Sequence, residues 1–317
     1  MIRINKELVV ILLLVIHLNS WSQLRPLSEL ELDEEIGQAF ITMDTFKNPD
    51  LRLNFTRINF GLDVKVQLNA DSLVLGKYPR EGELQDSDIH LDNFALGHIE
   101  GGEIIPFEIK DPFIELAFDN SFGKNDLAGI RLGFGDVKGK MSFDIKSLTG
   151  NINAKIKGDY DVETFLGTFT VDALAKATLV NESGGRDPVR ATMIGVPNGS
   201  LFGAVAFGII PIVLPVNNCT VAIVNENVCF PLSNFKTLDL GKKTGEDTFD
   251  FAPGMFLSLQ LKDMLWGNNT RKDPYIMASK GAFFNIPNGL LTLTPGQALG
   301  GLSRVQTEFI DRGVGRF

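Results

Sequence analysis

The sequence predicts an all-β protein, and two observations carry this prediction. Apolar and polar residues alternate from Ile58 to Leu68, and this period of two is typical of a strand with one buried face. No helical periodicity of any length interrupts residues 50–180, so a parallel sheet with crossover helices is disfavoured. We therefore expect an antiparallel meander that forms a sandwich, a partly open barrel or a solenoid-like sheet, with a short N-terminal helix and a minor C-terminal helix.

The start of the chain has the layout of a secretory signal peptide, which we assign to residues 1–22. A positively charged start precedes an apolar run over 8–16, which is shorter than the roughly 20 apolar residues of a membrane-spanning helix. Ser20 and Ser22 place small residues where a signal peptidase reads them, so we expect mature protein from about Gln23. Everything that follows is expected to fold outside the cytoplasm.

The mature chain is expected to have three parts. Residues 23–40 form a short helical leader, for which Ser28 is a suitable N-cap and Gly37 a suitable stop. Residues 41–199 form the antiparallel β domain. Residues 200–317 form a second β region that contains the cysteine pair and ends in a mixed tail with the minor helix.

Short alternating stretches succeed one another along the β domain, with turn residues between them. Apolar residues change phase near Arg57, from odd positions upstream to even positions downstream, so we expect a bulge or a bend there. This succession of short half-buried strands favours hairpins joined in sequence order. The stretches cover residues 51–55, 58–68, 89–91, 105–109, 114–118, 130–134, 141–145 and 152–156.

Cys219 and Cys229 are the two cysteines of the chain and flank an apolar, strand-like segment. In an oxidising compartment an even count favours a local disulfide, and two buried free thiols are the alternative. A metal site at this pair is disfavoured, because no other cysteine and no nearby histidine could complete a tetrahedral ligand set. No cofactor is expected.

Residues 201–216 contain no charged side chain, and two interpretations fit them. Pro211 and Pro215 make the segment a poor membrane helix, so two buried strands joined by a turn are the plainer interpretation. The more specific interpretation is that the segment contacts an apolar ligand or a membrane, because so long an uncharged run is costly when exposed. The contacting residues would be Leu201, Phe202, Phe207, Ile209, Ile210, Ile212, Val213 and Leu214.

One polar cluster is a candidate cation site. Residues two apart share a face of a strand, so Asp86, Asp88, His90 and Asp92 would form one ladder of metal ligands. The alternative, which we favour, is the solvated outer face of a strand whose inner face is apolar. The spacing does not match a calcium-binding loop, and no neighbouring residue completes the coordination sphere.

Composition narrows the class of protein. The net charge of -9 argues against nucleic acid as a partner and against binding an anionic membrane by charge alone. The 24 Phe against 3 Tyr and 2 Trp indicate dry cores or a dry cavity and disfavour the aromatic girdles of a transmembrane barrel. Beyond the signal peptide, His90 and His98 are the only histidines, and no nucleophile elbow or phosphate loop is present. No catalytic residue is therefore assigned.

Two parts of the chain resemble a loose group of uncharacterised envelope proteins of Gram-negative bacteria. The leader over 26–39 resembles theirs in its Leu-rich acidic stretch, followed by Gly-Gln and a small residue. The blocks 104–115 and 145–150 are similar to segments of proteins from Acinetobacter- and Pseudomonas-like bacteria, and some of the group are labelled as pilus-system proteins. The resemblance implies an exported protein of the periplasm or outer membrane and no enzyme activity.

We weigh three functions, in this order. The first is a non-enzymatic structural or assembly role in the cell envelope, pilus-associated in one form, with other envelope proteins as partners. The second is a carrier or conduit for an apolar ligand such as a lipid or hydrocarbon, since ligand cavities are concave and mostly apolar. Membrane contact is compatible with either role. The third is an exported hydrolase, because a catalytic triad is assembled in space and leaves no spacing pattern.

Overall fold

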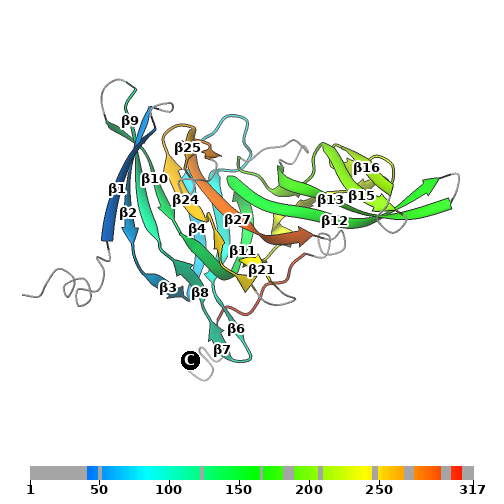
Figure 1. Cartoon of the computed structure of the whole chain (residues 1–317), viewed down its shortest axis with the longest axis horizontal. Coiled ribbons are helices and arrows are strands. Elements are labelled where there is room, and N and C mark those ends of the chain that lie inside the picture. The colour runs from blue at the N-terminus through cyan, green and yellow to red at the C-terminus, as the bar shows by residue number, and fades with distance from the viewer. Residues whose placement is uncertain are drawn as a thin grey trace, which may run out of the picture. The chain divides into compact units, whose positions relative to one another are not determined.

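The computed structural model describes residues 41–48, 52–121, 125–164, 167–180, 189–205, 210–244, 249–267, 275–293 and 301–308. They belong to one compact unit, Ile41–Phe317. Their regular structure is β-strand apart from one short 3-10 turn, η1 (Leu232–Asn234), so the all-β prediction is confirmed (Figure 1). The expected signal peptide, leader helix and most of the expected C-terminal helix lie outside the described residues. In the part of the chain that is described, no helix is long and apolar enough to cross a membrane.

The larger sheet has 14 strands among the described residues. Neighbours pair antiparallel, except that β12 and β27 run parallel. In spatial order the strands are β1 (Ile41–Asn48), β2 (Leu53–Phe60), β9 (Phe113–Asp119), β10 (Asp126–Gly133), β24 (Phe256–Gln260), β27 (Gly281–Leu293), β12 (Gly150–Thr164), β13 (Gly167–Val180), β15 (Gly199–Val205), β16 (Ile210–Asn217), β17 (Thr220–Val221) and β18 (Glu226–Asn227), while β14 (Met193–Gly195) joins β13 and β19 (Cys229–Pro231) joins β14.

The smaller sheet has seven strands in the described ranges, and three two-stranded hairpins or bridged pairs complete the fold. Its strands are β3 (Asp63–Val66), β8 (Phe107–Lys110), β11 (Asp136–Leu148), β5 (Ser87–Leu96) and β4 (Leu68–Lys77), with β20 (Thr237–Leu240) and β23 (Ala252–Pro253) also on β11. The pairs are β6 (His98–Glu100) with β7 (Glu103–Ile105), β21 (Lys242–Lys243) with β22 (Phe249–Asp250), and β25 (Met264–Trp266) with β26 (Ile276–Ala278).

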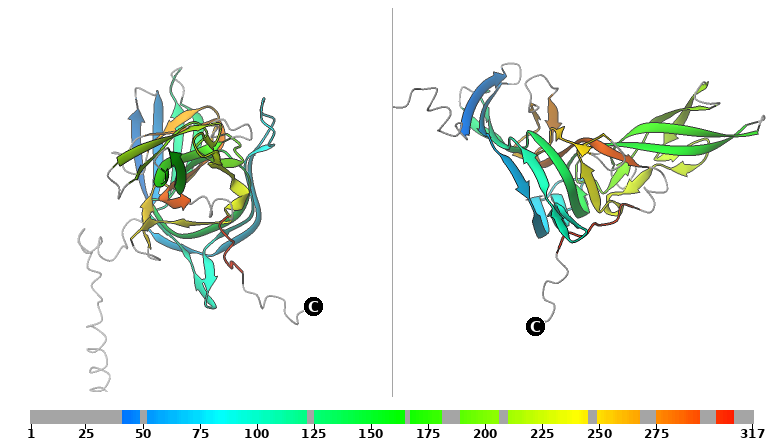
Figure 2. Two further views of the ribbon diagram at one scale, coloured as in Figure 1. Left: turned by 90° about the vertical axis from the view of Figure 1, so that its right-hand side faces the viewer. Right: turned by 60° about the horizontal axis from the view of Figure 1, so that its bottom comes forward.

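A shared crease joins the two sheets. Four chain segments pass from one sheet to the other through two residues each, at 61–62, 111–112, 134–135 and 254–255. Backbone hydrogen bonds run along this crease, from Phe60 N–H to the Pro112 carbonyl at 2.9 Å and from Phe134 N–H to the Met255 carbonyl at 3.0 Å. The strands therefore bend together, and the sheet curls into a nearly closed, barrel-like surface around the core (Figure 2).

The main core lies inside this curl and continues along the long β12–β13 hairpin. Phe107, Phe143 and Phe235 are almost fully buried in it, which agrees with the dry interior that the Phe-rich composition predicts. A separate, smaller core surrounds Phe55 and Trp266 beside β25 and β26.

The two expected β regions are not separate sheets. Strand β24 pairs with β10, and β27 pairs with β12, so residues from both regions share one sheet.

The expected bulge near Arg57 is wrong. The strand β2 keeps an unbroken register with both β1 and β9, and the bend comes later, at the crease over 61–62. The phase of the apolar residues changes because β2 is apolar on opposite faces at its two ends. Leu53 and Phe55 pack in the smaller core, whereas Ile58 lies on the other face of the strand.

Cys219 and Cys229 form the expected disulfide, with their Cα atoms 5.2 Å apart. The bond ties the segment after β16 to the start of β19 and packs against Val180 and Met193. A disulfide in a folded domain indicates an oxidising, exported environment.

We predict that replacing both cysteines with alanine lowers the free energy of unfolding by about 2.5 kcal/mol, because the bond no longer restricts the unfolded chain. Urea unfolding of the wild type and of Cys219→Ala/Cys229→Ala measures the difference. Reducing agent should shift the wild-type curve towards that of the variant and leave the variant unchanged. Identical wild-type curves with and without reductant would contradict a stabilising role for the bond.

Candidate functional site

One face of the larger sheet is apolar and open to solvent. Register aligns its large apolar side chains in two adjacent rows, one that crosses the strands from β1 to β24 and one that crosses β9, β10 and β24. Single exposed apolar residues are ordinary on protein surfaces, but contiguous rows mark a binding surface. The first row is Met43, Ile58, Ile114, Leu132 and Leu257, and the second is Leu116, Ile130 and Leu259.

The rows are only partly buried, and the first row reaches the main core at one end. Ile130 and Leu132 keep 41% of their surface exposed, and Leu259 keeps 47%. Leu257, at the end of the first row, packs against the main core. The open face is therefore a continuation of the core side of the sheet rather than an isolated surface patch.

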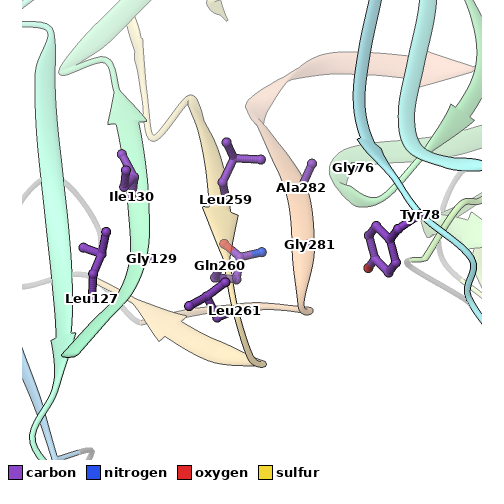
Figure 3. Close-up of a pocket in the computed structure, with 10 residues that line it drawn as sticks. All are labelled: Gly76, Tyr78, Leu127, Gly129, Ile130, Leu259, Gln260, Leu261, Gly281 and Ala282. Carbon is purple, nitrogen blue, oxygen red and sulfur yellow. The ribbon is translucent and has the colours of Figure 1, made fainter.

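A pocket of about 320 Å³ lies where this face approaches the end of β4 (Figure 3). Ile130 lines it from β10, Leu259 from β24 and Leu261 from just after β24, and Tyr78 stands across β27 from them. Gln260 also borders the pocket, but its amide donates to the Ser279 carbonyl and accepts from Trp266 Nε1. The pocket therefore presents mainly hydrocarbon to a ligand.

The opposite face of the same strands carries charge. Register places Arg57, Glu115, Arg131 and Ser258 in one row across β2, β9, β10 and β24, which we call the charged ladder. The Glu115 carboxylate accepts hydrogen bonds from Arg57 Nε at 2.7 Å and from Arg131 Nη2 at 2.6 Å. Glu115 and Arg131 are fully buried, so neither charge is stable there without the other.

The pair β25–β26 covers the charged ladder. The Arg131 guanidinium lies 5.0–5.2 Å from the ring centres of Phe113, Phe256 and Trp266, and it donates to the Gly267 carbonyl. Burial lowers the pKa of Arg131 to about 10, although the Glu115 carboxylate acts in the opposite direction. Arg131 therefore remains charged at neutral pH and needs its carboxylate partner.

A second buried ion pair stands beside the pocket. Asp88 is fully buried, and its carboxylate accepts from Arg190 Nε at 3.0 Å and from the Ala282 N–H at 2.9 Å. Arg190 also donates to the backbone carbonyls of Gly76 and Tyr78, so it anchors the end of β4. A side chain at Gly281 would collide with Asp88, which explains why β27 begins with glycine.

The structure does not gather the four candidate metal ligands around one point. Asp86 forms an ion pair with Lys77 at 3.0 Å, and Asp88 forms one with Arg190. His90 Nε2 lies 3.1 Å from the Asp92 carboxylate. In the described ranges, no group of three or more His, Cys, Asp or Glu side chains is placed to hold a metal ion. The expected solvated face is present at Asp86 but wrong for Asp88, which is a buried structural group.

The uncharged segment 201–216 contributes β15 and β16, which pair in antiparallel register as the plainer interpretation predicts. Only alternate residues are covered: Leu201 and Leu214 are fully buried, whereas Phe202 is 65% exposed. Ile210 and Val213 are also exposed, and Ile212 packs against the main core. Phe207 and Ile209 lie outside the described residues.

Comparison of the chain with known protein families, with characterised proteins and with solved structures finds no match.

We predict that Glu115→Gln lowers the free energy of unfolding by about 3 kcal/mol or more, because it leaves the buried Arg131 charge without its partner. Replacing the pair with Glu115→Leu/Arg131→Met should cost less than Glu115→Gln alone, since no buried charge is left over. Denaturant unfolding measures both effects.

The half-exposed pair Glu108–Lys138 supplies the matched control, and Glu108→Gln should cost less than about 1 kcal/mol. Equal losses for Glu115→Gln and Glu108→Gln would show that the charged ladder is not the stabilising contact described above.

Proposed function

We propose that this protein is a non-enzymatic exported carrier that holds an apolar ligand, such as a lipid or hydrocarbon chain, against its open apolar face. Two in-register apolar rows carry the proposal, and the second of them lines the pocket with Ile130 and Leu259. Each large apolar side chain gains about 1.5–3 kcal/mol when it is fully buried, so folding alone favours covering such rows. Rows left half-exposed favour a ligand that completes their burial.

The charged ladder supports the same proposal from the other side of the sheet. Among the described residues, the pair β25–β26 lies over Arg131 and Glu115, on the charged face of the sheet and not on the apolar face. Ligand pockets elsewhere have this composition, with apolar walls and few polar groups at their edge. Within the bacterial envelope, such a carrier would work in the periplasm or at the outer membrane.

We predict that purified mature protein binds the apolar fluorescent probe N-phenyl-1-naphthylamine, and that Ile130→Asp weakens binding at least tenfold because it puts a charge into the pocket. Leu259→Asp should act in the same way. Ile104→Asp is the matched control, because Ile104 is 45% exposed and lies on β7, away from the pocket. Fluorescence titration measures the affinities, and melting temperatures show whether each variant is folded.

Equal probe affinity in the wild type, Ile130→Asp and Leu259→Asp would contradict the carrier proposal. Equal loss in Ile104→Asp would show that the probe reports exposed apolar surface in general.

A structural or assembly role is the second candidate, and one observation favours it. Register aligns Leu174, Phe202 and Val213 across β13, β15 and β16, and all three side chains are exposed. This separate row on β13, β15 and β16 lies on strands that play no part in the pocket, so it suits contact with another envelope protein.

We predict for this second role that the wild type migrates in a high-mass complex when envelope extracts are separated on a native gel. Phe202→Ser should release the protein from that complex and leave probe binding unchanged. A wild-type protein that migrates alone would remove the assembly role and leave the carrier proposal standing.

A further inference from the structure

The pocket is small for a lipid-binding cavity. At about 320 Å³ it lies at the lower end of the roughly 300–1,000 Å³ range of ligand pockets. If each carbon of a chain takes about the 30 Å³ of a liquid water molecule, the pocket holds roughly ten carbons. The volume therefore matches one alkyl chain.

The residues that line the pocket are uncharged, but two arginines contact one of them, Tyr78. Arg80 donates a hydrogen bond to the Tyr78 hydroxyl, and the Arg190 guanidinium lies 4.9 Å from the centre of its ring. Arg80 Nη1 lies 3.5 Å from Asp88 Oδ1, the same oxygen that accepts from Arg190. Two guanidinium groups thus share one carboxylate, and Arg190 is 1% exposed whereas Arg80 is 23% exposed. Since Arg190 already neutralises Asp88 at the shorter distance, the excess charge resides on Arg80, at the accessible edge of the pair.

The same edge offers further polar groups. Tyr78, which lines the pocket, accepts a hydrogen bond from Arg80 at 3.2 Å, and its hydroxyl lies 3.3 Å from the Lys280 carbonyl. A hydroxyl at that distance makes a long hydrogen bond, so it can turn towards a better acceptor. Arg80 is therefore the cation that contacts the Tyr78 hydroxyl at this edge.

We propose that the ligand is a single-chain amphiphile with an acidic head group, whose tail lies against Ile130 and Leu259 and whose head group meets Arg80 and Tyr78. This rests on the proposed carrier function. The apolar wall takes the tail by burial, and the guanidinium binds the acidic oxygens through a charge-assisted hydrogen bond. An uncharged hydroxyl head group could accept from the same guanidinium but would gain less, because only the donor of that hydrogen bond is charged.

The test compares ligands that share one tail. Displacement of N-phenyl-1-naphthylamine by dodecanoate and by dodecan-1-ol at pH 8 gives the two affinities, and vesicles of dioleoyl phosphatidylglycerol present two chains with an acidic head. We expect dodecanoate to bind about tenfold more tightly than the alcohol and the two-chain lipid not to compete. Arg80→Gln should remove that tenfold preference and leave the affinity for the alcohol within twofold.

Two variants complete the experiment. Arg80→Lys keeps the charge and should retain most of the preference for dodecanoate, and Lys176→Gln removes an exposed charge from β13 as a matched control without effect. Equal affinity for the acid and the alcohol would overturn the acidic head group and leave the carrier function standing. Competition by the vesicles would overturn the single chain. Failure of both ligands to displace the bound probe would count against the carrier function itself.

Discussion

The pairing register of β2, β9, β10 and β24 is the constraint on which the site depends. In that register Arg57, Glu115 and Arg131 fall in one row on one face, where the two guanidinium groups reach the same carboxylate. A slip by one residue would turn every side chain of a strand to the other face. It would place Arg131 on the apolar face and a leucine or isoleucine beneath β25. The buried charges therefore decide which face of the sheet remains apolar and open.

The crease explains why the apolar face is not simply part of the core. On one side of it, Val64, Ile109 and Val137 contribute to the main core, and the curl of the sheet brings other strands over them. On the other side, the rows that contain Ile114 and Ile130 lie on strands that extend beyond that cover. The same face of the sheet is therefore buried in the core on one side of the crease and exposed on the other. The pocket lies at the boundary between the buried part and the exposed part.

Sequence alternation predicted the strands well, because the period of two is a local property of the backbone. Alternation could not tell which face of a strand is covered, since that depends on strands distant in sequence. Ile130 and Leu132 have the pattern of buried residues and are half-exposed, whereas Arg131 between them is buried. One signal was available: the glycines at 129 and 133 leave room on the Arg131 face for the side chains of Trp266 and Phe113.

The polar cluster at residues 86–92 shows the same limit. Its alternation predicted a strand with an apolar inner face, and Ile89 and Leu91 are buried as expected. Asp88 differs from Asp86 and Asp92 because Arg190 and the Ala282 N–H, both distant from it in the chain, bind its carboxylate. No local pattern carries that information. The disulfide was predictable because the two cysteines are close in sequence and have no competing partner.

The most direct test of the carrier account is to find where an alkyl ligand touches the protein. A twelve-carbon acid with a photoreactive diazirine near the end of its tail, irradiated with the purified protein, would label the side chains that line its binding site. The account predicts labels on β10 and β24, at Ile130, Leu259 and their neighbours, and their loss when excess dodecanoate is present. Labels confined to Phe202 and Val213, or labels that excess dodecanoate does not reduce, would contradict it.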